Sequence, residues 1–354
     1  MSSLDRRQLL KAGASLAVGS TFVSLVGSQA LAADPYAGAV LVDEDPAPIQ
    51  PGSFTVAVLP DTQSYGEGHP EGFMAQTKWL VDNQKARNIA AALHLGDITN
   101  RSLPAQWELA VAAMGQLDGK IPYFMVPGNH DYSAGGKCTD RTTLLNDYFS
   151  IDKFRTQKTF GGVYDKEPQK MENSYHLFSA GGRDFVVIGL EFGPRADVVR
   201  WANEVAAKHK DREAILITHA YMYYDESRYD WAEKGTKQHW NPHSYGVAKN
   251  SADDVMDGTE LWDNLVGKHE NFIMTLNGHV LYDGLGRMTS VTPGGRDVHQ
   301  MLVNFQTKPK GGDGWVRLME FTTDGGVNVV DYSPTRKQCN VSEQNKFALK
   351  LAKV

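Results

Sequence analysis

The chain has 354 residues, of which 41% are hydrophobic and 22% are charged. This balance is that of a globular protein and excludes a disordered or collagen-like chain. The 36 basic and 42 acidic side chains give a net charge of −6, which disfavours a protein that grips long nucleic acids. With only Cys138 and Cys339, the chain can form neither a disulfide scaffold nor a cysteine-ligated zinc module, which leaves one disulfide or two free thiols.

Residues 1–32 have the pattern of an export signal. Arg6 and Arg7 precede an uncharged stretch, Ala12–Ala32, which is rich in Ala, Gly and Ser and ends in an A-x-A sequence. The pattern favours a cleaved signal of the twin-arginine type over a membrane anchor. It predicts a periplasmic or secreted protein with no stable membrane span after cleavage. The remaining 322 residues would carry a net charge of −8 and can bury one large core or two modest ones.

Two segments are expected to lie beside the globular domain. Residues 33–52 contain four prolines and no apolar face, so we expect an extended lead-in outside the fold. We expect the globular domain over residues 53–335 and a C-terminal tail over residues 336–354.

Strand and helix patterns alternate at the start of the domain. Short apolar runs predict strands over Phe54–Leu59, Ile89–Leu95 and Tyr123–Val126. Apolar side chains at three- and four-residue steps predict helices over Phe73–Gln84 and from Pro104 to about Leu117. Three strands joined by helices indicate a parallel sheet.

The rest of the chain contains more strands and one long irregular segment. The predicted later elements are strands at Tyr175–Phe178, Phe185–Leu190, Ala214–Thr218, Phe272–Leu276, Met301–Phe305, Trp315–Phe321 and Val327–Asp331, and helices at Ala196–Lys208 and Glu260–Lys268. Residues 221–257 are polar and aromatic without a period, which is typical of a long functional loop or lid. Their Tyr and Trp side chains either clamp an organic substituent or pack the lid, and the sequence favours neither role.

Five predicted strands run directly into small polar clusters. The candidate site residues in these clusters are Asp61, Gln63, Asp97, Asn129, His130, His219 and His279. Because the carboxyl ends of strands in an α/β sheet meet at one edge, we expect these side chains to share one site. Carboxylates and amides suit hard divalent cations, and imidazoles suit Zn, Fe, Mn or Ni.

These donors predict a centre with two divalent ions. A carboxylate such as that of Asp97 can bridge two ions about 3.5–4 Å apart, which together clamp a phosphoryl group and activate a water molecule. Two aspartates leave residual positive charge that would attract a phosphate. Gly96, Gly128 and Gly278 precede these residues, at points where a Cβ atom would obstruct a close approach.

The clusters resemble the motifs of the calcineurin-like metallophosphoesterases, namely D-x-H, G-D-x-x-D, G-N-H-[D/E], a single His and G-H-x-H. The resemblance spans Asp61 to His279. It implies an α/β fold in which a two-sheet β-sandwich is flanked by helices, with the metal centre at the strand ends. It also implies two divalent ions, such as Mn, Fe or Zn.

The resemblance also implies a role for each matching residue. Asp61 would bind the first ion and Asp97 would bridge both ions, while Asn129, His219 and His279 would bind the second. His130 would contact the phosphate and help to protonate the leaving group.

Three positions depart from the family pattern. Gln63 replaces a His, Asn100 replaces an Asp beside His130, and Leu281 replaces the last His of G-H-x-H. We keep Gln63 as a candidate ligand through its amide oxygen, whereas Leu281 cannot coordinate a metal. We therefore expect a weaker first metal site, and the D-T-Q sequence resembles that of an exported bacterial branch of the superfamily.

Three further residues are candidates near the site. His299 or Asp283 could replace the missing ligand in principle, but a surface or supporting role is favoured for both because they lie in loop regions. We expect His94 to support the site from below through hydrogen bonds, because alternate residues of a strand face opposite sides.

We predict a hydrolase that cleaves phosphate monoesters or diesters of a small molecule, a lipid or a nucleotide. One alternative is a non-catalytic phosphate- or metal-binding protein with a degraded first site. Another is a sphingomyelinase- or nuclease-like phosphodiesterase, although the negative net charge argues against long nucleic acids as substrates.

Overall fold

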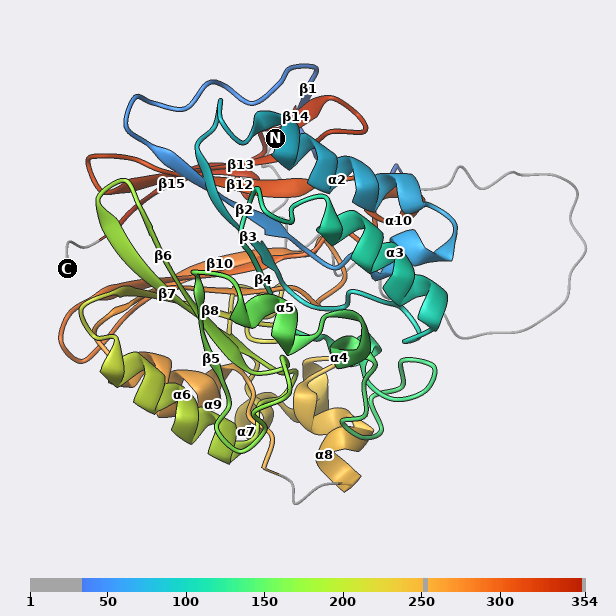
Figure 1. Ribbon diagram of the computed structural model, residues 1–354, viewed down its shortest axis with the longest axis vertical. Helices are drawn as coiled ribbons and strands as arrows, with labels where there is room; N and C mark the ends of the chain where they lie inside the picture. Colours follow the sequence, from blue (N-terminus) through green and yellow to red (C-terminus); the bar gives the residue numbers. More distant parts are fainter. Residues whose placement is uncertain (1–33, 251–253, 352–354) are drawn as a thin grey trace, which may run out of the picture. The chain divides into compact units, whose positions relative to one another are not determined.

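Two β-sheets form the centre of the part of the chain that begins at Pro35 (Figure 1). The computed structural model describes residues 34–250 and 254–351, so the predicted export signal lies outside the described residues. Within these ranges, no helix combines the length and apolar character needed to cross a bilayer.

The first sheet has the strand order β1-β14-β13-β12-β2-β3-β4, and β15 pairs with β13. Its strands are β1 (Leu41–Val42), β2 (Phe54–Leu59), β3 (Ile89–His94), β4 (Tyr123–Met125), β12 (Val316–Phe321), β13 (Gly326–Ser333), β14 (Gln338–Asn340) and β15 (Lys346–Lys350). Strands β2, β3 and β4 are parallel, which confirms the pairing predicted from their connecting helices. The other pairs are antiparallel.

The second sheet has the strand order β10-β11-β9-β8-β7-β6-β5. Its strands are β5 (Phe160–Val163), β6 (Ser174–Ala180), β7 (Arg183–Leu190), β8 (Glu213–Thr218), β9 (Phe272–Asn277), β10 (Leu285–Val291) and β11 (Asp297–Val303). Strands β7, β8, β9 and β11 are parallel to their neighbours within this group. Each sheet therefore has a parallel part whose strands end at one edge.

Apolar side chains from both sheets fill the space between them. Phe54 of β2 stacks on Phe321 of β12 with ring centroids 5.0 Å apart, and packs edge-on against Phe185 of β7 at 5.7 Å. All three rings are buried, and complete burial of such a side chain contributes about 1.5–3 kcal/mol to folding. The two sheets therefore form a sandwich with a shared core.

Helices cover the outer face of each sheet (Figure 1). Helices α2 (Pro70–Asn83) and α3 (Pro104–Gly115) pack on the first sheet, and helices α6 (Ala196–Lys208) and α9 (Gly258–Asn264) pack on the second. The shorter helices are η1 (Gln63–Glu67), η2 (Asn129–Asp131), α4 (Leu145–Tyr148), α5 (Ile151–Arg155), α7 (Trp231–Lys234), η3 (Gly235–Lys237), η4 (Pro242–Ser244), α8 (Gly246–Asn250), η5 (Val266–Lys268) and α10 (Pro309–Gly312). This arrangement confirms the predicted two-sheet sandwich flanked by helices.

The structure differs from the sequence-based expectation beside the domain. Within the expected lead-in, β1 pairs with β14, and the carbonyl oxygen of Ala47 accepts a hydrogen bond from Arg87 at 3.0 Å. Within the expected tail, β15 pairs with β13. Both segments therefore join the first sheet, because the backbone groups of an open strand provide pairing that needs no periodic apolar pattern.

The two cysteines are separate, buried free thiols. Cys138 packs in the apolar cluster on the outer face of the second sheet, whereas Cys339 packs in the cluster on the outer face of the first. Of the two alternatives left by the sequence, the structure therefore has free thiols instead of a disulfide.

Candidate metal centre

The predicted ligands lie at the carboxyl ends of parallel strands. Asp61, Asp97 and Asn129 follow β2, β3 and β4 of the first sheet, and His219 and His279 follow β8 and β9 of the second. The backbone N–H of His279 donates to the Asp61 carboxylate at 3.0 Å, so the ends of the two sheets meet at this point. The structure thus brings together four of the predicted ligands, namely Asp61, Asp97, His219 and His279.

Asp97, His219 and His279 form the centre of this site. One ligand atom of each lies within 4.8 Å of those of the other two, and all three residues are buried. His219 Nε2 lies 3.2 Å from Asp97 Oδ2 and 3.2 Å from His279 Nδ1. Two imidazoles and a carboxylate therefore face one another in a space closed to bulk water.

Backbone carbonyls fix the orientation of both imidazoles. His219 Nδ1 lies 2.8 Å from the carbonyl oxygen of Leu95, and His279 Nε2 lies 2.8 Å from that of Trp240. In each ring the nitrogen beside the carbonyl donates its hydrogen, so in the neutral ring the other nitrogen directs its lone pair into the site. These lone pairs and the Asp97 carboxylate need a proton or a metal cation between them.

Two predicted ligands, Gln63 and Asn129, each have a buried amide oxygen without a hydrogen bond. Gln63 Oε1 and Asn129 Oδ1 are buried and have no partner among the described residues. An unsatisfied buried acceptor costs about 1–3 kcal/mol, so both oxygens favour a bound cation or water. Together with the orientation of the two imidazoles, they fit the divalent ions that the strand-end donors predict.

Asp61 is held by three donors from three segments. It accepts hydrogen bonds from the His279 backbone, from Asn304 Nδ2 at 2.9 Å and from Gln306 Nε2 at 3.3 Å. Burial is the largest influence on the Asp61 carboxyl, and with the nearby Asp97 charge it raises the pKa to about 8, although His219 opposes the shift. A cation beside Asp61 would favour its charged form.

The other titratable groups of the centre show the same competition between burial and neighbouring charges. Burial raises the pKa of Asp97, but the charges of His219 and His130 outweigh it and lower the pKa to about 2. Burial lowers the pKa of His219, but Asp97 and Asp61 outweigh it and raise the pKa to about 9. Burial and the His219 charge lower the pKa of His279 to about 3.

His130 lies at the border of the site and is partly exposed. Its backbone N–H donates to Asp97 Oδ1 at 2.9 Å, and its Nδ1 lies 2.8 Å from the carbonyl oxygen of Asn100. The Asn100 side chain instead donates to Glu67 Oε1 at 3.0 Å. At position 100, the backbone therefore contacts His130, whereas the side chain points to Glu67.

Asp131 connects two of the strand-end loops, a role that the sequence did not reveal. Its carboxylate accepts hydrogen bonds from the backbone N–H groups of Ile98, Thr99 and Gly128 at 2.8–3.0 Å. Burial and the Asp97 charge raise its pKa to about 6. The sequence feature that could have indicated this role is the position of Asp131 directly after His130, in the same strand-end cluster.

Asn304 and Gln306 are also contacts that the sequence analysis missed. Asn304 directly follows β11, which is parallel to β9 and ends at the same edge. The apolar run Met301–Phe305 predicted a strand that continued through position 304. The polar Asn304 within this apolar run was the sequence feature that could have indicated a contact with the site.

Glycines allow the strand ends to approach one another. A Cβ atom at Gly128 would overlap the Asp97 carboxylate, and one at Gly278 would overlap the Asp61 carboxylate. A Cβ atom at Gly96 would lie 2.8 Å from His219 Nδ1. The close approach predicted for these three glycines is present in the structure.

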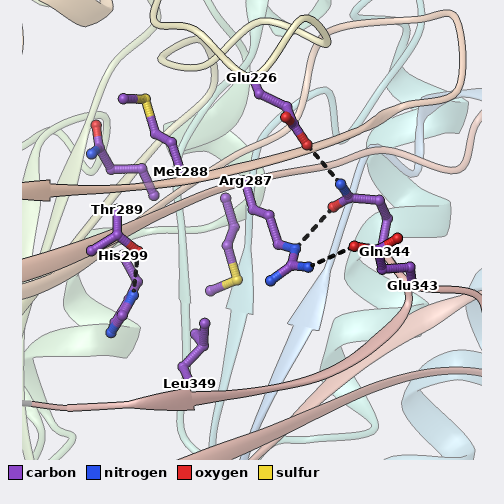
Figure 2. Close-up of a pocket in the computed structure, with 10 residues that line it drawn as sticks. Glu226, Arg287, Met288, Thr289, His299, Glu343, Gln344 and Leu349 are labelled. Carbon is purple, nitrogen blue, oxygen red and sulfur yellow. Dashed lines mark hydrogen bonds and ion pairs between the residues drawn. The ribbon is translucent and has the colours of Figure 1, made fainter. Parts of the chain in front are cut away.

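The two candidate replacements for the missing ligand do not take part in the centre. His299 lines a separate cavity of about 350 Å³ between β10, β11 and β15 (Figure 2). Its Nδ1 lies 2.9 Å from Thr289 Oγ1 and its Nε2 lies 3.1 Å from the carbonyl oxygen of Lys350. Asp283 accepts a hydrogen bond from the backbone of Leu285 at the start of β10.

His94 lies beneath the centre, fully buried. Its Nε2 lies 3.0 Å from Thr62 Oγ1, and its Nδ1 accepts a hydrogen bond from the Gly96 backbone at 3.2 Å. Both contacts are to residues beside predicted ligands. The structure therefore places His94 where the sequence analysis expected a supporting residue.

The chain is similar to several known proteins. The chain is 31% identical over 319 residues to the uncharacterized protein YvnB of Bacillus subtilis (strain 168), a match that covers 88% of this chain and 22% of YvnB. The purple acid phosphatase PPD1 of yellow lupin (Lupinus luteus) has a similar fold, with a TM-score of 0.50 and 13% identity over 86% of this chain and 55% of the lupin chain. The 5'-nucleotidase precursor of Thermus thermophilus gives a TM-score of 0.43 with 14% identity over 84% of this chain and 54% of that chain.

The chain thus spans less than two thirds of the length of each of these proteins. Residues 54–286, well over half of the chain, match the family model described as calcineurin-like phosphoesterase. This region contains all of the predicted ligands and His130. The chain therefore belongs to the calcineurin-like phosphoesterase family, a family of phosphoric ester hydrolases.

Proposed function

We propose that this protein hydrolyses small phosphate monoesters or diesters at a centre of two divalent ions. The observation that carries the proposal is the convergence of lone pairs at the meeting point of the two sheets. Asp97, His219 and His279 face one another, and Gln63 and Asn129 add unpaired amide oxygens. Such a set of acceptors needs protons or cations between its members, and two divalent ions would satisfy all of them at once.

Each ion would have its own set of ligands. Asp61, Gln63 and Asp97 would hold the first ion, and Asp97, Asn129, His219 and His279 would hold the second. The nitrogen and oxygen donors suit Mn, Fe or Zn, and the first set, which has no imidazole, would bind its ion less tightly. When bound, such ions supply Lewis acidity and a water molecule that is activated near neutral pH.

The protein's own groups would orient the substrate and carry its proton. The carbonyl of Asn100 accepts the Nδ1 hydrogen of His130 and fixes the plane of the ring. His130 Nε2 is then available to contact the phosphate and to deliver a proton to the departing alcohol oxygen. Asn304 and Gln306 hold the Asp61 carboxylate in place during this step.

The proposed setting is the periplasm or the exterior of the cell. Its support is the twin-arginine pattern around Arg6 and Arg7 and the A-x-A sequence that ends at Ala32. Substrates there would be small organic phosphates, because the acidic chain lacks the clustered Lys and Arg of proteins that bind long nucleic acids.

The proposal is tested by assaying an aryl phosphate and a bis-aryl phosphate with the purified protein and Mn, Fe or Zn. We expect hydrolysis of at least one ester, dependent on added metal and absent from an Asp97→Ala control. Faster cleavage of the aryl phosphate would identify a monoesterase, and faster cleavage of the bis-aryl phosphate would identify a diesterase. No hydrolysis of either ester, with a single tightly bound ion, would contradict the proposal and indicate a phosphate- or metal-binding protein.

A further inference from the structure

The aromatic side chains of residues 221–245 divide into a buried group and an exposed group. Tyr221, Tyr223 and Tyr229 are at most 4% exposed and pack in the core of the second sheet. His239 is exposed, and Tyr224 and Trp240 are partly exposed. Some aromatic residues of this segment therefore lie at the surface and do not belong to the core.

The exposed part joins a tyrosine from the loop after His279. Tyr282 is 40% exposed and lies with its ring centroid 4.2 Å from Tyr224 and 5.7 Å from Trp240. Its hydroxyl lies 2.9 Å from His239 Nδ1. We call these four residues, Tyr224, His239, Trp240 and Tyr282, the aromatic rim.

The aromatic rim is attached directly to the proposed metal centre. The carbonyl of Trp240 lies 2.8 Å from His279 Nε2, and Tyr282 follows His279 by three residues. The rim therefore adjoins a residue that we assign to the second ion. A substrate whose phosphate occupies the centre would reach the rim with an alcohol part that extends past His279.

The rim is held rigidly by the core beneath it. The hydroxyl of Tyr229 donates to the carbonyl of His239 at 2.9 Å, and the backbone N–H of His239 donates to the hydroxyl of Tyr223 at 3.2 Å. Because both tyrosines are buried, the rim keeps its form without a ligand. Such preorganisation lowers the entropy lost on binding.

Two rim residues have a strained backbone. Trp240 has φ = 63° and Tyr282 has φ = 66°, in the left-handed region that bulky residues rarely adopt. The strain costs free energy and persists only where the surrounding structure imposes it, most often beside functional sites. The strained backbone places two aromatic side chains on an accessible surface, where burial contributes little free energy to offset the strain.

We infer that the aromatic rim binds a flat ring on the alcohol part of the substrate. The rim contains no carboxylate, ammonium or guanidinium group, and the neighbouring Asp225 is paired with Lys234 at 3.5 Å. It therefore favours an uncharged ring over a second phosphate, and offset or edge-to-face contacts favour a ring over an alkyl chain. The inference rests on the proposed phosphoesterase function, because the phosphate places the ring.

The test compares phenylphosphonate with methylphosphonate, which contain a P–C bond and are not hydrolysed as esters. We expect the metal-loaded protein to bind phenylphosphonate about three- to tenfold more tightly in calorimetric titration. In Tyr282→Ala the affinity ratio should fall close to one, whereas Tyr282→Phe should retain it because the ring remains. Val291→Ala, which alters an exposed apolar side chain at the end of β10, is the matched control and should keep the wild-type ratio.

A second pair of compounds, both phosphate monoesters, tests which kind of ring the rim binds. The ratio of kcat/KM for adenosine 5'-monophosphate to that for ribose 5-phosphate reports on a nucleobase, whereas the phosphonate pair reports on an aryl group. A preference that depends on Tyr282 in either pair supports the inference. Equal ratios in wild type and Tyr282→Ala for both pairs overturn it.

The binding experiment with the two phosphonates tests the aromatic rim independently of the proposed hydrolase function, because it requires no hydrolysis. If the protein cleaves no ester but binds phenylphosphonate more tightly in a way that depends on Tyr282, the proposed hydrolase function is rejected. The inference that the aromatic rim binds a flat ring is then still supported. If Tyr282→Ala is unfolded by circular dichroism, His239→Ala provides the same comparison, because it alters an exposed member of the rim.

Discussion

His130 is the side chain that we expect to carry the proton of the reaction. Removing a general acid typically lowers turnover by about 10²–10⁴-fold, so we predict this loss in His130→Ala. The metal content should remain at the wild-type value, because only the backbone of His130 contacts Asp97. The measurement is kcat together with elemental analysis of the same sample.

A matched control for this prediction is His69→Ala, which alters an exposed histidine at the start of α2. It should retain wild-type turnover. Unchanged turnover in His130→Ala would remove His130 from the mechanism, and loss of metal in that variant would show that it acts as a ligand.

The strand ends approach so closely that a single methyl group should disturb the centre. A Cβ atom at Gly278 would overlap the Asp61 carboxylate, so Gly278→Ala should displace Asp61 and weaken binding of the first ion. We expect loss of one ion per chain and at least a tenfold fall in turnover, since one misplaced group can cost about 10²-fold. Metal titration and kcat measure the two effects.

The control for Gly278→Ala is Gly115→Ala at the end of α3. The nearest atom to its new Cβ would be Asp118 Oδ2 at 3.7 Å, an ordinary contact, so metal binding and turnover should be unchanged. Full metal occupancy in Gly278→Ala would contradict the predicted role of Asp61.

Much of the centre could be predicted because parallel strands end at a common edge. Asp61, Asp97 and His219 come directly after strands with clear apolar patterns, so their convergence followed from topology. Asn304 was missed because the apolar residues around it predicted a longer strand. The contact between Trp240 and His279 depends on the path of a loop without a period, which local sequence does not specify.

The short strands beside the domain could not be predicted for a different reason. Strands β1 and β14 have two and three residues, too few for an alternating pattern. Strand β15 has five residues, and its only alternating signal is Phe347 and Leu349 between more exposed neighbours. Their backbones pair with strands already in the first sheet, so tertiary contacts instead of local propensity determine them.

For the whole molecule, the centre joins the two sheets, so metal binding should stabilise the fold. Asp61 belongs to the first sheet and accepts a hydrogen bond from His279 of the second. An ion that binds only the folded state adds about 2.7 kcal/mol at a free concentration of 100 times its Kd. We predict that a chelator lowers the Tm by several degrees and that added Mn, Fe or Zn restores it, as measured by calorimetry.

The control for this prediction is Asp97→Ala, whose Tm should respond weakly to the chelator because its shared ligand is absent. An equal Tm of the wild-type protein with and without the chelator would show that metal binding and folding are not coupled.

We propose that donors from five strand ends together hold two ions, with Asp97 between them. The decisive measurement is the number of divalent ions bound per chain in the wild-type protein and in Asp97→Ala after dialysis against Mn, Fe or Zn. We predict two ions in the wild type and the loss of both in the variant, because Asp97 belongs to both ligand sets. Two ions retained by a folded Asp97→Ala protein would contradict it.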